Sequence, residues 1–226
     1  MKCQIILGKR ALSEVFRLQP ERIIEVLTAG DPLEFQQMGM KARRVNKNLL
    51  TEMAGTEHHQ GVVAQVTRRP SLPLSAFFDK SLLLALDGVL DPQNMGAILR
   101  TAEGFGVEGV LWSKNRCCGI TPAVSKASAG ASEVINFSEV SNLAEALRTL
   151  KGEGFSVAVA DMDGDAEVTF PDKLILVMGS EEKGVQPLIR KMADWIVGIS
   201  MHGQISSLNV SVATAVFLDR YRRTSK

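Results

Sequence analysis

Residues 82–112 read LLLALDGVLDPQNMGAILRTAEGFGVEGVLW, and this stretch decides the fold. Two apolar runs, 82–87 and 107–112, are long enough for buried strands. Between them, apolar residues recur at helical spacing over 94–105, just after the helix-starting pair Asp91-Pro92. Strands of nearly continuous apolar character that alternate with helices indicate a parallel sheet covered by helices on both faces. The stretch therefore predicts the first strand–helix–strand unit of an α/β fold.

The same alternation continues toward the C-terminus. Further strands are predicted at 156–160, 174–178 and 195–199, and further helices at 141–151, 185–192 and 208–222. Ligands of open parallel sheets bind outside the carboxyl ends of the strands. The loops that follow these strands are therefore the first places to search for a functional site.

The front of the chain has a different organisation. Short helix and strand patterns alternate before a composition break at 68–74, where two prolines and two arginines indicate an exposed linker. We predict a small α/β domain over residues 1–68, a linker over 69–79 and the parallel-sheet domain over 80–226. A domain of about 70 residues builds only a small core of its own.

Composition narrows the classes of protein. The chain has 226 residues, a net charge of +1, 45% hydrophobic and 23% charged residues, which fits a globular protein without a strong overall field. Nucleic acid, if bound, must therefore meet local basic patches, and the candidates are 9–10, 43–47, 68–69 and 220–226. No apolar run approaches the roughly 20 residues that span a bilayer, and we expect a cytoplasmic protein.

Metal chemistry is not expected. The three cysteines and three histidines lack the spacing of metal ligands or of a disulfide framework. His59 is either an RNA contact or, as we favour, a structural histidine. The acidic stretch 161–167 imitates a calcium loop, but its glycine is misplaced, so we expect a solvated turn. The vicinal pair Cys117-Cys118 is expected to serve packing.

The first candidate loop leads into the helix at 94–105. Asn94 lies beside free backbone amides, which suit an anionic ligand. Gly96 costs a helix interior about 1 kcal/mol relative to alanine, and we expect it to leave space for a ligand to reach Arg100. The planar guanidinium of Arg100 suits a phosphate. The alternative is an ordinary solvated face with an Arg100–Glu103 pair.

The second candidate loop is Gly179-Ser180-Glu181-Glu182-Lys183-Gly184. It is not a P-loop, because the Lys-Ser/Thr that must follow is replaced by Val185-Gln186. Its two carboxylates favour a ligand with hydroxyl groups or positive charge. The alternative is a plain turn in which Glu181 and Glu182 stabilise the next helix through its dipole.

The third candidate loop precedes the last helix. Ser206, Ser207, Asn209 and Ser211 place hydroxyl and amide groups before a long apolar helix. Serine capping explains part of this pattern. Asn209 is a poor helix former at this place, and its amide donates and accepts hydrogen bonds at once, so a polar ligand site is the second explanation.

Taken in this order, the three blocks resemble the SpoU (TrmH) family of RNA ribose 2′-O-methyltransferases in the SPOUT superfamily. The blocks are Asn94-x-Gly96-Ala97-x-x-Arg100-Thr101-Ala102-Glu103, Gly179-Ser180-Glu181-x-x-Gly184 and Ser207-Leu208-Asn209-Val210-Ser211. The likeness covers roughly residues 80–222. Two further stretches, 59–64 and 126–131, resemble the branch that modifies a guanosine in 23S rRNA.

The resemblance implies an enzyme that uses S-adenosyl-L-methionine to methylate the ribose 2′-hydroxyl of a guanosine in 23S rRNA. It further implies a trefoil knot in the C-terminal domain, an L30e-like RNA-binding front domain and a homodimer. Methylation of tRNA and a non-catalytic RNA-binding or ribosome-assembly role remain the alternatives. One departure is Ser200, which stands where the family usually has proline.

The family's functional positions match nine residues of this chain. The resemblance assigns cofactor binding to Gly179, Ile199, Met201 and Leu208, and catalysis to Asn94, Arg100, Glu181, Ser207 and Asn209. We expect Arg100 to clamp the target phosphate and stabilise the developing alkoxide rather than act as a base, because a guanidinium keeps its proton at neutral pH. Ser207 and Asn209 are expected to orient the ribose, and Glu181 to steer the guanidinium.

Overall fold

The computed structural model describes residues 3–205 and 207–224, which form two compact units. The first unit contains the chain up to Pro70 together with Ile120–Val134, and the second contains Ser71–Gly119 together with the chain from Ile135 onward. Residues 120–134 thus pack in the first unit, although they lie within the range 80–226 that the sequence assigned to the C-terminal domain. The predicted limits 1–68, 69–79 and 80–226 stay a prediction.

The second unit is built on a six-stranded parallel sheet, which confirms the predicted α/β class. The strand order is β10-β8-β9-β5-β6-β7. The strands are β5 (Leu82–Asp87), β6 (Gly109–Ser113), β7 (Phe137–Val140), β8 (Ser156–Asp165), β9 (Leu174–Gly179) and β10 (Trp195–Val197). The central strands β5 and β9 are buried along their whole length, as their unbroken apolar sequences require.

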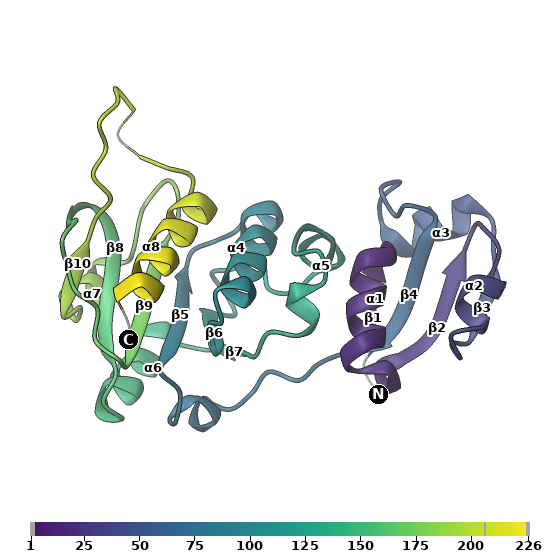
Figure 1. The fold of residues 1–226 in the computed structure, drawn as a ribbon, viewed down its shortest axis with the longest axis horizontal. Coiled ribbons are helices and arrows are strands. Elements are labelled where there is room, and N and C mark those ends of the chain that lie inside the picture. The colour runs from purple at the N-terminus through teal and green to yellow at the C-terminus, as the bar shows by residue number, and fades with distance from the viewer. Residues whose placement is uncertain (1–2, 206, 225–226) are drawn as a thin grey trace. The chain divides into compact units, whose positions relative to one another are not determined.

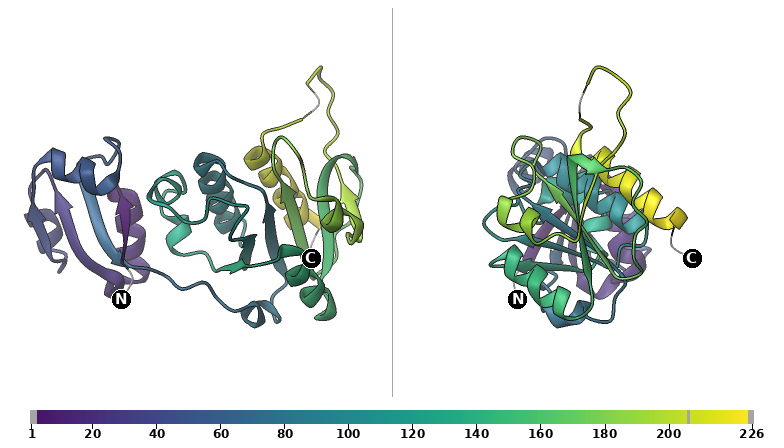
Figure 2. Two further views of the ribbon diagram at one scale, coloured as in Figure 1. Left: turned by 180° about the vertical axis from the view of Figure 1, so that it is seen from behind. Right: turned by 90° about the vertical axis from the view of Figure 1, so that its left-hand side faces the viewer.

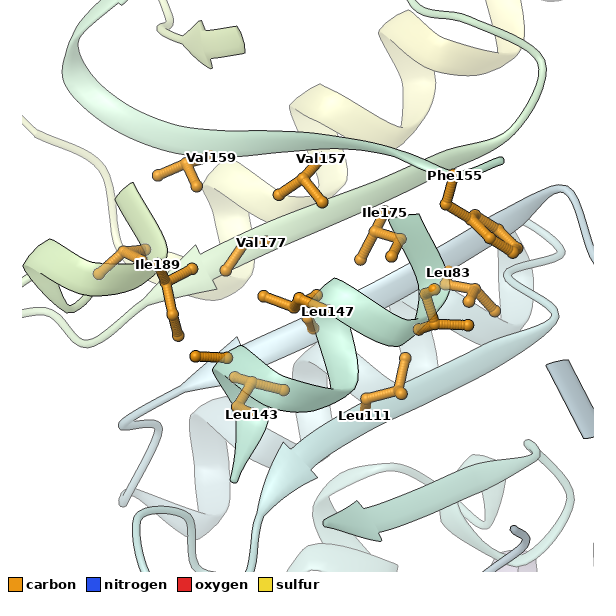
Figure 3. Close-up of a cluster of buried hydrophobic side chains, with 14 of the residues drawn as sticks. Leu83, Leu111, Leu143, Leu147, Phe155, Val157, Val159, Ile175, Val177 and Ile189 are labelled. Carbon is orange, nitrogen blue, oxygen red and sulfur yellow. The ribbon is translucent and has the colours of Figure 1, made fainter. Parts of the chain in front are cut away.

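Helices cover both faces of this sheet (Figure 2). They are α4 (Pro92–Gly104), α6 (Leu143–Gly152), α7 (Pro187–Lys191) and α8 (Val210–Thr224). One face packs against α6 and α7, where Leu147 and Ile189 meet Leu83 and Val177 of the strands (Figure 3). On the opposite face α4 packs against α8. A short 3-10 turn, η2 (Leu74–Phe77), leads into β5.

The carboxyl ends of β5 and β9 lie side by side, because Asp87 pairs in register with Gly179. The loop before α4 follows β5, and the acidic loop follows β9. β6 lies on the other side of β5, so its loop opens at the same edge. The topology therefore gathers the strand-end loops that the sequence indicated.

The first unit has a four-stranded mixed sheet of order β1-β4-β2-β3 (Figure 1). Its elements are β1 (Cys3–Leu7), α1 (Lys9–Leu18), η1 (Pro20–Arg22), β2 (Ile23–Thr28), α2 (Leu33–Gln36), β3 (Ala42–Arg44), α3 (Lys47–Ala54), β4 (Val62–Thr67), α5 (Pro122–Ala127) and η3 (Ala131–Glu133). Leu12 of α1 packs on one face, and Leu50 of α3 belongs to a separate cluster with Leu7 and Leu27. Two small clusters thus stabilise this unit from either side of the sheet.

In the part of the chain that the structure describes, no helix is long and apolar enough to cross a membrane.

Candidate functional site

Helix α4 begins as its sequence predicts. The Asp91 carboxylate accepts hydrogen bonds from the backbone amides of Gln93 and Asn94, at 3.1 and 3.3 Å, and Pro92 occupies the first turn. Gly96, however, is buried. Arg100 itself is exposed, so the open space that Gly96 was expected to leave beside its guanidinium stays a prediction.

Three of the predicted catalytic side chains form a closed hydrogen-bonded triangle. Asn94 Nδ2 donates to Glu181 Oε1 at 3.1 Å. Asn209 Nδ2 donates both to Glu181 Oε1 at 2.6 Å and to Asn94 Oδ1 at 2.9 Å. The residues come from the start of α4, the acidic loop after β9 and the turn before α8, so the triangle joins all three sequence blocks.

The free oxygen of Asn209 fixes this arrangement. Asn209 Oδ1 accepts from the backbone amide of Ser211 at 2.9 Å and from its Oγ at 2.6 Å. These bonds determine which end of the amide faces Glu181, since the oxygen is committed to the helix start. The amide group therefore presents its two donors to the triangle. Ser206 lies outside the described residues.

A cavity of about 660 Å³ opens beside the triangle. Its wall includes all four predicted cofactor residues and three predicted catalytic ones, namely Gly179, Ile199, Met201, Leu208, Glu181, Ser207 and Asn209. This volume suits a small organic ligand. The carboxylates of Asp161, Glu181 and Glu182 also line the cavity, which favours a ligand with positive charge.

Two details of this wall follow from the sequence. A Cβ at Gly179 would clash with the backbone of Gly184 and Val185, so only glycine permits the tight turn of the acidic loop. Asp161 and Met162 belong to β8, which runs on to Asp165. The expectation of a solvated turn over 161–167 is therefore wrong for the segment up to Asp165. The exposed polar residues of this segment gave no strand pattern, although β8 continues through it and pairs there with the three-residue strand β10.

Arg100 is the predicted catalytic residue that the structure brings neither to the triangle nor to the wall of this cavity. It is exposed on α4, and its side chain hydrogen-bonds to no residue within 3–205 and 207–224. Glu181 accepts from Asn94 and Asn209 instead. In a single chain, the expected steering of Arg100 by Glu181 is therefore not seen.

Sequence reasoning missed a second cavity of about 440 Å³ at the same edge of the sheet. Its wall contains Asn94 and Glu181, and also Asn115 and Arg116, which follow β6. The signal was the position of these two residues: β6 is the next strand along the chain, and its end must lie at the same edge. The run Lys114-Asn115-Arg116 lies outside the three blocks that resemble the family, so the resemblance does not indicate it.

The remaining titratable candidates are structural. His59 is buried; its Nδ1 accepts from the Gly61 amide at 3.0 Å, and Thr51 Oγ1 lies 3.3 Å from Nε2. Burial raises the pKa of Cys117, and burial together with the neighbouring Cys117 raises the pKa of Cys118 to about 11. Protonated thiols of this kind are poor nucleophiles. Among the described residues, no group of three or more metal ligands is found.

Comparison with known proteins places this geometry in a family. Residues 81–219 match the SpoU rRNA Methylase family, and residues 5–72 match the description "RNA 2'-O ribose methyltransferase substrate binding". The first match covers more than half of the chain, and the chain belongs to the SpoU rRNA methylase family. The predicted recognition is thereby confirmed.

Relatives match over nearly the whole chain. A 23S rRNA (guanosine-2′-O-)-methyltransferase RlmB of Shewanella oneidensis is 37% identical over 96% of this chain and 96% of its own length. The RlmB of Haemophilus influenzae is 36% identical over 94% of each. Among solved structures, the AdoMet-bound rRNA methyltransferase of Sinorhizobium meliloti has a TM-score of 0.83 at 22% identity, covering 98% of this chain and 87% of its own. That likeness confirms the fold.

Proposed function

We propose that this protein transfers a methyl group from S-adenosyl-L-methionine to the ribose 2′-hydroxyl of a guanosine in 23S rRNA. The observation that carries the proposal is the Asn94–Glu181–Asn209 triangle, which borders a cavity with all four predicted cofactor residues. The relatives from Shewanella and Haemophilus are named as 23S rRNA (guanosine-2′-O-)-methyltransferases, and they match 96% and 94% of this chain.

The 660 Å³ cavity fits the proposed cofactor. When bound, S-adenosyl-L-methionine supplies an electrophilic methyl group on a positively charged sulfur. The carboxylates of Asp161 and Glu181 would stabilise that charge, and Met201 and Leu208 add apolar surface. Gly179 lets the acidic loop fold back closely on itself at the wall of the cavity.

The catalytic assignments remain those of the sequence blocks. Asn209 and Ser207 orient the ribose, because both present hydrogen-bonding groups at the cavity wall. Arg100 holds the RNA phosphate and stabilises the developing alkoxide; its guanidinium is too weak an acid to serve as a proton acceptor at neutral pH. Glu181 holds the amides of Asn94 and Asn209 in place.

The first unit is the proposed RNA-binding part of the molecule. Its matched description concerns substrate binding by RNA 2′-O ribose methyltransferases. Arg43, Arg44 and Lys47 are exposed on this unit and offer phosphate contacts. We expect binding through shape and phosphates, since aromatic residues, which stack on bases, make up only 5% of the chain.

A homodimer and a trefoil knot in the second unit are also part of the proposal. Val212 and Val216, one turn apart on α8, are 49% and 39% exposed, which is the kind of apolar surface that a second copy covers. Arg100 then belongs to a site completed by the partner. Sedimentation equilibrium would test the dimer, and a purely monomeric protein at micromolar concentration would contradict it.

The activity is tested directly. The purified chain is incubated with labelled S-adenosyl-L-methionine and 23S rRNA transcript, and ribose methylation is mapped by resistance to alkaline cleavage. One methylated guanosine is expected, with no product from bulk tRNA. Calorimetric titration of the cofactor is the control for the site. Cofactor binding without any ribose methylation would contradict the proposal and favour a non-catalytic RNA-binding role.

A further inference from the structure

A buried carboxylate joins three strand-end loops beneath the 440 Å³ cavity. Asp87, the last residue of β5, is 1% exposed. Its Oδ2 accepts from the Gln186 backbone amide at 2.7 Å, and its Oδ1 accepts from Gln186 Nε2 at 2.8 Å and from Arg116 Nε at 3.2 Å. The loops after β5, β6 and β9 are therefore fixed to one charge.

This arrangement orients Arg116. Its Nε is held by Asp87, and in the described part of the chain no residue hydrogen-bonds to its Nη1 or Nη2. The side chain is 46% exposed and lines the cavity. A fixed guanidinium thus offers two parallel donors at its outer end. Such a fork matches a planar pair of acceptors.

The other walls of the cavity decide which acceptor pair fits. Asp91, Glu181 and Glu182 line it with Arg116 and Lys183, so carboxylates outnumber cations and disfavour a phosphate. Val89, Leu90 and Val210 supply apolar surface against which a flat ring can lie. Guanine has acceptors at O6 and N7 and donors at N1 and N2, so it matches an arginine on one edge and a carboxylate on the other.

We propose that this cavity receives the target guanine base and that Arg116 determines specificity by donating to O6 and N7. Glu182, which hydrogen-bonds to no side chain in the described residues, faces the N1 and N2 donors. Adenine carries a donor in place of O6 and a lone pair at N1, so it would oppose both groups. Arg116 belongs to no block through which the chain resembles its family.

The position of the cavity agrees with the reaction. Asn94 lines this cavity, Asn209 lines the cofactor cavity, and Glu181 lines both. The hydrogen-bonded triangle is thus the shared wall. A base in one cavity and a cofactor in the other leave the ribose at that wall, where the triangle meets it. The inference rests on the proposed function, since it names how the same site selects its nucleotide.

The test removes one acceptor from the RNA and one donor group from the protein. 23S rRNA is transcribed with guanosine or with 7-deazaguanosine, which lacks N7. Methylation kcat/KM is then measured for the wild-type chain, Arg116→Ala, Arg116→Lys and the control Arg148→Ala. Arg148 also pairs with a carboxylate, at 2.7 Å from Glu145, and is similarly exposed, but it lies on α6 away from the cavity.

A bidentate base contact corresponds to roughly 5- to 150-fold discrimination. For wild type and Arg148→Ala, we expect kcat/KM to be at least about fivefold lower on 7-deaza RNA than on guanosine RNA, which is the lower end of that range. Arg116→Ala should have a low kcat/KM on guanosine RNA, and its kcat/KM should fall little further on 7-deaza RNA. Any loss that remains in Arg116→Ala reports altered RNA folding. Arg116→Lys keeps the charge without the fork and should behave like the alanine variant.

Equal losses in wild type and both Arg116 variants would overturn the inference, because the arginine would then not read N7. Unchanged cofactor affinity in calorimetry shows that the variants are folded. If Arg116→Ala is too slow to measure, the comparison rests on Arg116→Lys. Failure of the proposed function gives a different result, namely no methylation of guanosine RNA by the wild-type chain.

Discussion

At the scale of single residues, Asn209 shows why the site needs an amide. Its nitrogen donates to Glu181 and Asn94, and its oxygen accepts twice from Ser211. A carboxylate of the same shape keeps the two bonds from Ser211 but opposes Glu181 across 2.6 Å. Asparagine is therefore the side chain that satisfies the helix start and the triangle together.

Replacement of Asn209 by aspartate is expected to create a pH-dependent enzyme. Near neutral pH the two carboxylates repel each other, and loss of a hydrogen bond to a charged group predicts a decrease in kcat/KM of roughly 10- to 150-fold. Paired carboxylates share a proton as the pH falls. Activity of the Asn209→Asp variant relative to wild type should therefore rise from pH 8 to pH 5. Methyl transfer assayed across this range measures the effect.

Asn209→Ala is the matched control, since it removes the donor without adding a charge. Its activity relative to wild type should not vary over the same pH range. A flat ratio for Asn209→Asp as well would mean that Glu181 and residue 209 do not face each other during the reaction.

The sequence predicted the members of the triangle but not their contacts. Asn94 was expected to face an anionic ligand, whereas its side chain is committed to Glu181 and Asn209. Helix-end chemistry is local and can be read from adjacent residues. The contact between residues 94, 181 and 209 depends on the order of the strands, which no local pattern specifies.

At the scale of elements, one aspartate anchors the edge strand that precedes Ile199 and Met201. β10 has only three residues and pairs with β8 alone. Just before it, Asp194 accepts from Lys151 Nζ at 2.7 Å and from the Val157 amide at 2.8 Å, which ties the strand to α6 and β8. Burial raises the pKa of Asp194, but the hydrogen bonds from Lys151 and Val157 outweigh it and lower the pKa overall.

Asp194→Asn should therefore destabilise the protein at neutral pH but not in acid. A carboxyl whose pKa is depressed by folding stabilises the fold above its unfolded pKa of about 3.9, and this contribution disappears as the pH falls through the folded value. Urea unfolding at pH 7 and at pH 3 measures the difference. If Asp194→Asn lowered the free energy of unfolding equally at both pH values, the charge of Asp194 would not contribute to stability. Asp163→Asn, an exposed residue of the same strand region, is the control.

Elements with strong periodicity were predicted well, and edge elements were not. The buried strands β5 and β9 have unbroken apolar sequences and appear within a residue of the expected limits. β7 was missed because Phe137-Ser138-Glu139-Val140 is short and half polar. It lies at the sheet edge, with β6 as its strand neighbour on one side and hydrogen bonds to Ser71 and Leu72 on the other.

At the scale of the whole molecule, the chain returns to its first unit after building half of the second. Residues 120–134 pack against α1 and β1. Glu133, 1% exposed, accepts there from Arg22 Nη2 at 2.9 Å and from Gln4 Nε2 at 2.8 Å. Sequence patterns could not reveal this return, because the contacts join residues more than 100 positions apart. The predicted linker at 68–74 indicated only the first of the places where the chain passes from one unit to the other.

Glu133→Ala is expected to destabilise the first unit strongly, although the substitution lies far along the chain from it. Removal of one partner of a buried ion pair leaves an uncompensated charge, here Arg22, and costs about 3–5 kcal/mol. Replacing both partners, as in Arg22→Met with Glu133→Leu, should recover part of that loss, because Arg22 is no longer left as a buried charge, whereas the half-buried Arg69 still loses its attraction to Glu133. Hydrogen exchange of β1 and β4 peptides reports the stability of this unit separately from that of the parallel sheet.

Glu34→Ala is the control. It breaks the exposed ion pair with Lys9 and should lower the free energy of unfolding by less than about 1 kcal/mol. If Glu133→Ala were as mild as this control, residues 120–134 would contribute little to the first unit, and its stability would come from residues up to Pro70 alone.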